Sequence, residues 1–289
     1  MKIYINGKLR RRQDAKISVF DHGLLYGDGV FEGIRAYNGR LFMLEEHIER
    51  LFRSARAIVL KIPQSRQALR RAVIATCKAN RIVNGYVRPL VTRGVGTLGL
   101  NPYTCRQPQV IIIADKIQLY SEFLYERGLK VVTVGTLRNH NESLSPCIKS
   151  LNYLNNIMAK IEALNAGAEE AVMLNAQGNV AEASGDNIFI FKGQQLLTPP
   201  VSAGALEGIT RNLVLDLARQ RGYATAEANL TRYDLYTADE MFLTGTAAEI
   251  ISVVNMDGRV IGSGRPGRRT RDLMASFHAL AQSSGTPIE

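Results

Sequence analysis

Residues 146–167 read PCIKSLNYLNNIMAKIEALNAG, the most informative stretch of the chain. Its apolar residues recur at helical spacing and Gly167 provides a stop, so the pattern predicts an amphipathic helix. Lys149 is then expected at the start of that helix, between a proline turn and a buried apolar face. A lysine held against apolar surface loses hydration, which favours its neutral amine and suits Schiff-base chemistry. An ordinary lysine at a helix end is the alternative. The apolar stripe consists of Leu151, Leu154, Met158, Ile161 and Leu164.

Length and composition indicate a folded protein with one large or two ordinary domains. The chain has 289 residues, of which 46% are apolar, enough to fill real cores. Its net charge of +10 raises the alternative of a nucleic-acid-binding protein. The basic clusters at residues 10–12 and 265–271 lie near the two ends and lack interleaved aromatic residues. A solvated basic surface is therefore the better interpretation.

Cysteine usage and hydropathy favour a cytoplasmic protein. Cys77, Cys105 and Cys147 are odd in number and lack metal-ligand spacing, so we expect no metal site and a reducing compartment. Residues 1–12 read as two strands around an Asn-Gly turn, not as a signal peptide. The longest fully apolar run, residues 110–114, is too short to span a bilayer.

Hairpin signals and helical periods predict two linked α+β domains instead of a doubly wound sheet. Asn-Gly pairs at Asn6, Asn38 and Asn84 each precede a strand-like run, which is a strong hairpin signal. We expect a small N-terminal domain at residues 1–118, an interdomain loop at 119–128, and a larger C-terminal domain of strands with packed helices at 129–289. Helices are expected at residues 44–58, 64–80, 210–221 and 270–282, and strands at 86–93 and 110–116.

Residues 94–99 read GVGTLG, a literal G-x-G-x-x-G motif after a strand-like run. Asp115 follows a second such run, at a plausible distance for a ribose-binding acid. A dinucleotide fold, however, needs a helix between the two strands. Only LNPYTCRQPQ intervenes here, and Pro102 and Pro108 interrupt it. We therefore reject the nicotinamide oxidoreductase interpretation and expect a flexible glycine loop near a pocket.

Three other features suggest an anion or cofactor site, although each also has an ordinary structural explanation. Residues 206–221 read LEGITRNLVLDLARQR, where Gly208 allows close backbone approach and Thr210 is a good N-cap. The run TGTAAE at residues 244–249 predicts an amide-rich turn, or merely a tight one. Glu182 stands among small residues where a carboxylate could approach a ring nitrogen, but the general expectation is a solvated turn acid.

Together these segments resemble the class IV aminotransferases, the fold-type IV pyridoxal-phosphate enzymes, and most closely the branched-chain amino acid aminotransferases. The joint order and spacing of the segments carry the resemblance, which spans nearly the whole chain. The matching segments are DHGLLYGDGVFEGIR (21–35), HIERL (47–51), YVRPL (86–90), KSLNYL (149–154), AEASGDNIF (181–189), LEGITR (206–211), FLTGTAAEI (242–250) and SVVNMDGRVIG (252–262).

The resemblance implies pyridoxal 5′-phosphate as cofactor and assigns residues to it. Lys149 would be the catalytic lysine that carries the cofactor and moves the proton from the substrate Cα. Glu182 would keep the ring nitrogen protonated. Arg50 would bind the phosphate, although helical periodicity alone places it on the solvent side. The other implied contacts are Tyr153 at the phenolic oxygen, Leu206 on the ring face, and Gly208, Ile209, Thr210, Gly245 and Thr246 around the phosphate.

The resemblance also implies a substrate pocket that accepts both a branched apolar side chain and the carboxylate of glutamate or 2-oxoglutarate. Arg88, with Tyr26 and Tyr120 at the rim, would bind the distal carboxylate. Tyr86 and the amides of Thr246 and Ala247 would bind the α-carboxylate. Phe31, Gly33 and Arg35 alternate along one strand and would share a face. In relatives the tyrosine matching Tyr26 and the loop ending at Leu100 reach in from a second subunit, so a homodimer is the minimum unit.

The subclass depends on these pocket residues, because the same fold hosts D-amino acid and R-selective amine aminotransferases. Four positions separate Lys149 from Tyr153, a spacing shared with the D-amino acid branch, which usually lacks this tyrosine. The expected activity is transamination between L-leucine, L-isoleucine or L-valine and 2-oxoglutarate, with the D-amino acid or amine activity as the alternative. The preference among the three amino acids, and dimer against hexamer, stay open at this point.

Overall fold

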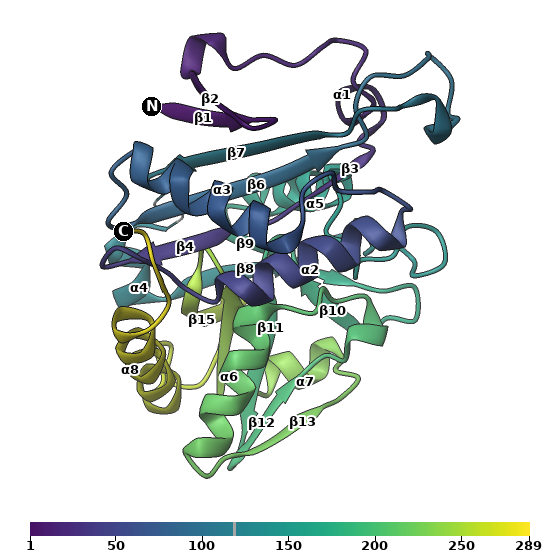
Figure 1. Cartoon of the computed structure of the whole chain (residues 1–289). Helices are drawn as coiled ribbons and strands as arrows, with labels where there is room; N and C mark the ends of the chain where they lie inside the picture. The colour runs from purple at the N-terminus through teal and green to yellow at the C-terminus, as the bar shows by residue number, and fades with distance from the viewer. Residues whose placement is uncertain (118–119) are drawn as a thin grey trace. The chain divides into compact units, whose positions relative to one another are not determined.

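The computed structural model describes residues 1–117 and 120–289, and the chain forms two compact units. Each unit has its own sheet (Figure 1). Each unit also has its own hydrophobic core. The expected boundary between residues 118 and 119 lies outside the described residues. The stretch that follows it is not only a loop, because residues Glu122–Arg127 form helix α4 in the second unit.

The first unit is not contiguous in sequence, and this differs from the expected division of the chain. Besides residues 1–117 it contains residues 148–152 and 281–289. Ser150 forms a β-bridge with Val30, and strand β17 at the end of the chain pairs with β5. These pairings join residues far apart in sequence, which a reading of local pattern cannot detect.

The sheet of the first unit is antiparallel, with the order β17-β5-β4-β6-β7-β1-β2 and β3 also paired with β6. The Asn-Gly hairpins predicted at Asn6 and Asn38 are confirmed, and both asparagines have positive φ angles of 48°. Asn84 instead ends the connection from α3, and its side chain accepts a hydrogen bond from the Asn38 amide (3.0 Å). The strands are β1 Lys2–Ile5, β2 Lys8–Arg11, β3 Gly29–Phe31, β4 Ile34–Tyr37, β5 Arg40–Leu41, β6 Gly85–Thr92, β7 Gln109–Asp115 and β17 Thr286–Pro287.

A proline in the middle of β6 divides the neighbouring strand into β3 and β4. Pro89 has no amide hydrogen, so the ladder is interrupted opposite it, although its carbonyl still accepts from the Glu32 amide (2.8 Å). Glu32 and Gly33 occupy the interruption between β3 and β4. This interruption positions several of the predicted site residues.

Helices α2 and α3 cover the core of the first unit, as the helical periods predict. Their apolar residues, among them Leu51 and Val73, pack with sheet residues such as Val87 and Ile112. Residues 93–108, between β6 and β7, contain only the short η2 turn, and the two strands are antiparallel. A dinucleotide fold is therefore excluded here. The helical elements are η1 Arg12–Asp14, α1 His22–Tyr26, α2 Leu44–Ala57, α3 Arg66–Ala79 and η2 Pro102–Thr104.

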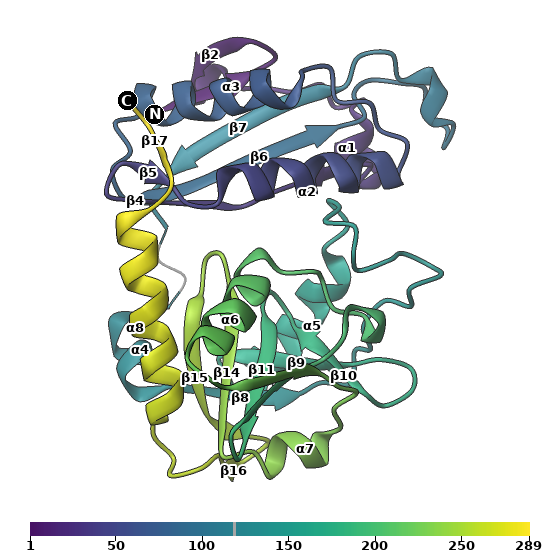
Figure 2. The same ribbon diagram turned by 60° about the horizontal axis from the view of Figure 1, so that its bottom comes forward.

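The second unit is built on a mixed sheet with the order β10-β9-β8-β15-β14-β11-β12-β13, and β16 also pairs with β15. The β8–β9, β8–β15 and β12–β13 pairs are parallel, and the other pairs are antiparallel. Helix α6 contacts β13 and β14 (Figure 2). The strands are β8 Leu129–Thr133, β9 Glu170–Leu174, β10 Val180–Ala183, β11 Asn187–Lys192, β12 Gln195–Thr198, β13 Ala224–Glu227, β14 Glu240–Gly245, β15 Glu249–Met256 and β16 Arg259–Val260.

The prediction for the helix after Lys149 is wrong in its start and in its buried face. Helix α5 begins at Leu154, with Tyr153 at its N-cap. It buries Asn156, Ala159 and Ala163, while the apolar stripe from Leu154 to Leu164 is exposed. Helical period identifies a stripe, but it does not say which side of the helix is covered. The predicted helices at 210–221 and 270–282 are confirmed as α6 Ile209–Gln220 and α8 Arg268–Ser283; η3 is Val201–Ala203 and α7 is Arg232–Tyr236.

Candidate active site

Lys149 lies beside strand β3 in the first unit, five residues before α5. Its backbone is fixed on both sides: the amide donates to the Ser54 hydroxyl of α2 (3.2 Å), and the carbonyl accepts from the Phe31 amide (3.0 Å). The Lys149 Nζ lies 4.6 Å from the centroid of the Phe31 ring, within cation–π distance. The amine of Lys149 therefore lies against an apolar surface, as predicted. That surface is the Phe31 ring, and pairing with β3 holds the lysine beside it; the start of a helix does not.

Arg50, the predicted phosphate ligand, is buried in an ion pair that the sequence did not reveal. Its Nε and Nη2 donate to the two carboxylate oxygens of Glu32 at 2.6 and 2.9 Å. The solvent position given by helical periodicity is wrong, because Arg50 is only 4% exposed. Glu32 compensates the buried guanidinium charge, which explains how an arginine is tolerated at this depth.

His47 completes this buried group, one turn before Arg50 on α2. Its Nδ1 lies 2.8 Å from Glu32. Burial alone would raise the pKa of Glu32, but Arg50 and His47 outweigh it and hold that pKa well below its usual range. Burial lowers the pKa of His47, and the positive charges of Arg50 and Lys149 act in the same direction. His47 is therefore expected to be neutral at neutral pH.

The predicted substrate residues of β3, β4 and β6 occupy one half-open face of the first sheet. Along β6, half-buried Tyr86 and Arg88 alternate with buried neighbours. The Arg88 Nη2 donates to the Tyr86 hydroxyl (2.9 Å), and its Cζ lies 4.6 Å from the Phe31 ring centroid. Among the described residues, the buried Arg88 Nε has no hydrogen-bond partner. Gly33 leaves room for Tyr86, because a Cβ there would lie 1.8 Å from the tyrosine hydroxyl oxygen.

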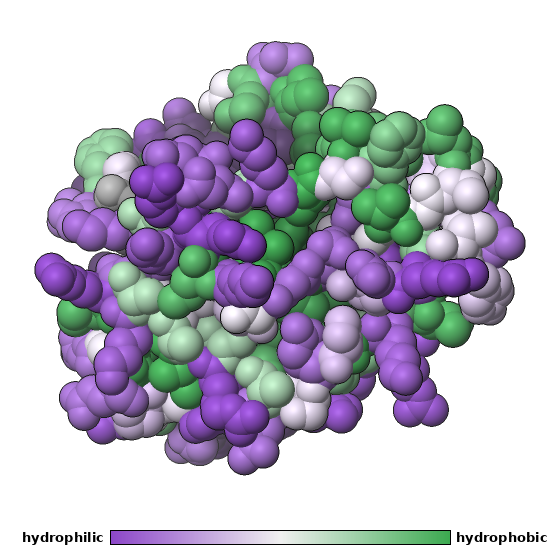
Figure 3. All heavy atoms as spheres, turned by 45° about the horizontal axis from the view of Figure 1, so that its top comes forward, coloured by the Kyte–Doolittle hydropathy of each residue, from purple (hydrophilic) through white to green (hydrophobic). Residues whose placement is uncertain are grey.

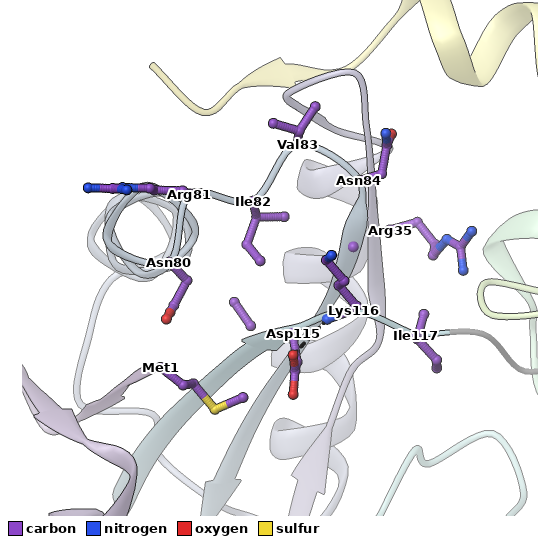
Figure 4. Close-up of a pocket in the computed structure, with 12 residues that line it drawn as sticks. Met1, Arg35, Asn80, Arg81, Ile82, Val83, Asn84, Asp115, Lys116 and Ile117 are labelled. Atoms are coloured by element: carbon purple, nitrogen blue, oxygen red, sulfur yellow. Dashed lines mark hydrogen bonds between the residues drawn. The ribbon is translucent and has the colours of Figure 1, made fainter.

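Arg35 lines a cavity of about 800 Å³ in the first unit, near the start of β6 and the end of β7. Figure 4 shows its guanidinium turned away from Asn80 and Arg81, on the opposite side of the cavity. Of the site residues predicted from the sequence, only Arg35 is among those that line this cavity in the described structure. This cavity is therefore not where the predicted cofactor contacts gather.

Tyr26 and the glycine loop, predicted to reach another subunit, lie together in the first unit. The Tyr26 hydroxyl donates to the Leu98 carbonyl (2.9 Å), and His22 Nε2 lies 2.8 Å from the Thr97 carbonyl. Leu98 and Leu100 are 70% and 79% exposed. Figure 3 shows hydrophobic side chains, in green, gathered toward the upper right, the direction in which α1 lies in Figure 1.

In the second unit Glu182 is a buried strand residue, so the solvated-turn alternative is wrong. It lies in β10 and is 5% exposed. Its Oε1 is 2.7 Å from Arg138 Nη2, and its Oε2 accepts from the Leu206 amide (2.9 Å) and from Asn187 Nδ2 (3.3 Å). All three donors favour the ionised carboxylate.

The start of α6 lies where the anion site was predicted, but its cap differs from the prediction. Gly208, not Thr210, is the N-cap, and among the described residues no side chain caps the helix. A Cβ at Gly208 would lie 2.0 Å from Asn187 Oδ1, so a larger residue there would displace the Asn187 side chain. Ile209 and Thr210 are buried in the first turn, and Leu206 is half-buried before it. The predicted turn after β14 is confirmed at residues 246–248, which include Thr246 and Ala247.

The two remaining predicted site residues, Tyr153 and Tyr120, differ in burial and in the groups around them. Tyr153 is half-buried at the N-cap of α5, also in the second unit. Tyr120 is 7% exposed, and its hydroxyl lies 3.3 Å from Glu170 and 3.5 Å from Asp186. Burial raises the pKa of Tyr120, and the two carboxylates add to the effect. Two acids thus already face this hydroxyl, which counts against the predicted role of Tyr120 in binding a substrate carboxylate.

Sequence reasoning missed three residues that hold the predicted ones in place: Glu32, His47 and Arg138. The first two lie inside matching segments, but only a contact with Arg50 distinguishes them from ordinary surface residues. Arg138 lies outside every matching segment and carries no local signal. Among the described residues, no group of three or more His, Cys, Asp or Glu could hold a metal ion, and no helix is long and apolar enough to cross a membrane.

Comparison with known proteins identifies the family. Residues 29–256 match the family described as Amino-transferase class IV. The chain belongs to the class IV aminotransferases, and these enzymes use pyridoxal phosphate. Within that class it belongs to the family of branched-chain-amino-acid aminotransferases, as its relatives show.

A branched-chain-amino-acid aminotransferase from Pseudomonas aeruginosa is 40% identical over 96% of this chain and 92% of its own length. The crystal structure of the Escherichia coli branched-chain amino acid aminotransferase has a TM-score of 0.97 at 33% identity and covers 100% of this chain and 99% of that one. The T.th. branched-chain amino acid aminotransferase complexed with N-(5′-phosphopyridoxyl)-L-glutamate has a TM-score of 0.92 at 35% identity, over 97% and 94% of the two chains. The fold-type IV architecture is thereby confirmed.

Proposed function

We propose that this enzyme transfers amino groups between L-branched-chain amino acids and 2-oxoglutarate, giving branched-chain 2-oxo acids and L-glutamate. The observation that carries the proposal is the half-open face around Arg88. It presents an apolar ring, Phe31, next to a guanidinium whose Nε has no partner in the described structure. Such a face suits an aliphatic side chain in one half-reaction and a carboxylate in the other. The glutamate adduct bound by the T.th. relative supports the acidic partner.

The residues present fit pyridoxal phosphate. In the second unit, α6 starts at a glycine without a side-chain cap, so its first amides and its dipole favour a phosphate. Thr246 lies in the turn after β14 of the same unit. In the first unit, Arg50 is the corresponding cation; Glu32 occupies its Nε and Nη2, which fixes the orientation of the guanidinium. Glu182, Tyr153 and Leu206 are proposed for the ring nitrogen, the phenolic oxygen and the ring face.

When bound, pyridoxal phosphate supplies an aldehyde for the amino group and a ring that withdraws electrons from the substrate Cα. Lys149 would carry the cofactor and then move the proton at Cα, since it is the lysine whose backbone is fixed by both Ser54 and Phe31. Glu182 would hold a proton on the ring nitrogen. Tyr86 and the amides of the turn containing Thr246 and Ala247 would bind the α-carboxylate.

We infer that the working unit is at least a homodimer. In the first unit, exposed apolar residues occur on α1, on the glycine loop and on η2, for example Leu24 (61%), Leu98 (70%) and Tyr103 (80%). In the second unit the stripe of α5 is also exposed, for example Leu154 (69%) and Leu164 (59%). Apolar patches of this kind are typical of surfaces that another chain covers. Free Cys77, Cys105 and Cys147 are consistent with a cytoplasmic enzyme.

Replacement of Arg88 by leucine tests the proposal. Arg88→Leu removes the charge that would pair with the distal carboxylate, so the half-reaction with glutamate should lose about 2–4 kcal/mol of transition-state stabilisation. The half-reaction with leucine should fall far less, because its side chain carries no charge. Single-turnover spectroscopy of each half-reaction measures the two effects separately.

Lys116→Leu provides a control, since it removes a cation from an exposed position at the end of β7. It should affect neither half-reaction. Equal losses for leucine and glutamate in Arg88→Leu would show that Arg88 only maintains the fold of the pocket. If D-alanine or an R-amine were the best donor of the unmodified enzyme, the D-amino acid or amine activity would replace the proposed one.

A further inference from the structure

Arg138 is a buried arginine of the second unit, and each nitrogen of its guanidinium contacts a neighbouring group. Its side chain is 7% exposed, and its Nη2 lies 2.7 Å from Glu182 Oε1. Its Nε donates to the Gly204 carbonyl (3.2 Å), and its Nη1 donates to Asn156 Oδ1 (3.0 Å). A guanidinium held at several nitrogens has little freedom to turn, so its charge is fixed beside Glu182.

The anchors of Arg138 are themselves fixed by the strands and helices around it. Asn156 is one of the three residues that α5 buries, and its Nδ2 donates to the Ser184 carbonyl (2.7 Å). The amide of Arg138 donates to the Leu174 carbonyl at the end of β9 (2.8 Å). This explains why an asparagine occupies the covered face of α5 while leucines are exposed: its amide connects Arg138 to the segment after β10.

The charge of Arg138 would act on any proton that Glu182 shared with a ring nitrogen. A carboxylate and a pyridine-type nitrogen in contact compete for one proton, and a neighbouring cation stabilises the carboxylate in its ionised form. The Leu206 amide and Asn187 also donate to Glu182, but they are neutral. Arg138 brings a full positive charge to Glu182, so it has a larger effect than these neutral donors on where the proton lies.

We propose that Arg138 is a positioning residue, which keeps Glu182 ionised and so keeps the proton on the ring nitrogen of the cofactor. The proposal rests on the proposed role of Glu182 and extends it to a residue outside the short matching segments of the sequence analysis. In this role Arg138 acts through its positive charge and not through its shape alone. A lysine should therefore replace it better than a glutamine does.

The experiment follows the ring nitrogen directly, by NMR of the holoenzyme loaded with pyridoxal phosphate labelled with ¹⁵N at that nitrogen. The ¹⁵N chemical shift at neutral pH reports the fraction of ring nitrogen that carries the proton, independently of turnover. In Arg138→Gln, which keeps a neutral donor, we expect the shared proton to move toward Glu182, so that the ratio of protonated to unprotonated ring nitrogen falls about tenfold or more. Arg138→Lys should lie between Arg138→Gln and the unmodified enzyme.

Arg93→Gln is the matched control. Arg93 is equally buried (9% exposed side chain) and forms a bidentate pair at 2.9 Å, but it belongs to the first unit and its partner is a different carboxylate, that of Asp28. Its protonated fraction of ring nitrogen should equal that of the unmodified enzyme. If Arg138→Gln does not fold, Asn156→Ala serves instead: it leaves Arg138 in place with one anchor fewer and should lower the protonated fraction by a smaller amount.

Two results would overturn the proposal: a protonated fraction of ring nitrogen in Arg138→Gln or Asn156→Ala equal to the unmodified value, or a fraction in Arg138→Lys as low as that in Arg138→Gln. Failure of the proposed function would look different. In that case the unmodified enzyme would bind no cofactor, or Glu182→Gln would leave the protonated fraction unchanged.

Discussion

Replacement of Glu32 by glutamine should destabilise the protein strongly, although the two side chains have nearly the same shape. Glu32 is fully buried and receives Arg50 at 2.6 and 2.9 Å and His47 at 2.8 Å. A glutamine cannot balance the charge of Arg50, which would remain buried without a counterion. Breaking a buried pair by removing one partner costs about 3–5 kcal/mol.

Urea unfolding of the apoprotein, followed by circular dichroism, measures this cost. Glu49→Gln is the control, because Glu49 is adjacent to Arg50 on α2 but pairs with Arg66 at the surface, where both side chains are more than half exposed. Exposed pairs contribute little, so its midpoint should not move measurably. A loss below about 1 kcal/mol in Glu32→Gln would refute the reasoning that Arg50 needs this counterion.

Two further predictions concern pH and the ring nitrogen. The pKa of His47 is lowered from its ordinary 6.5 in the folded protein, so the unfolded state takes up a proton more readily. The free energy of unfolding should therefore be at its full value above pH 6.5 and should fall as the pH drops toward the folded pKa. His47→Gln should make this fall less steep below pH 6.5, and an unchanged slope would show that another group titrates. Glu182→Gln should lower turnover far more than cofactor affinity, because an amide cannot hold the ring nitrogen protonated while the phosphate contacts persist. Steady-state kinetics measures the turnover, and fluorescence titration with pyridoxal phosphate measures the affinity. Equal losses in both would indicate that Glu182 is a structural residue.

The local sequence pattern correctly predicted the helices whose apolar residues recur at helical spacing and face the core. Helices α2, α3, α6 and α8 follow their apolar periods, and the left-handed conformations of Asn6 and Asn38 follow from the Asn-Gly pairs. The same signal was misleading for α5, whose apolar stripe is exposed while Asn156 and two alanines are buried. The apolar period shows that the two sides of a helix differ, but the packing of the neighbouring strand determines which side is buried.

The candidate site was predictable only where a residue type and a matching segment coincided. Lys149 and Glu182 were predicted in that way. The burial of Arg50 was not visible, because it depends on Glu32, 18 positions away and beside a strand. Arg138 reaches Glu182 across 44 positions (182 − 138), with no periodic signal to join them. Contacts of this kind depend on the register of the fold, which local sequence does not encode.

The central claim is that Lys149 carries the cofactor, and borohydride reduction tests it most directly. Reduction of the holoenzyme followed by peptide mass spectrometry should locate the pyridoxyl group on Lys149, whose backbone is fixed beside Phe31. Lys160, on the following helix, is the internal comparison, because its ammonium already donates to the Glu169 carbonyl (2.6 Å) and to Glu170 (2.9 Å). Lys149→Ala should retain some cofactor but lose turnover by orders of magnitude. A pyridoxyl group on Lys160, or full turnover in Lys149→Ala, would contradict the account.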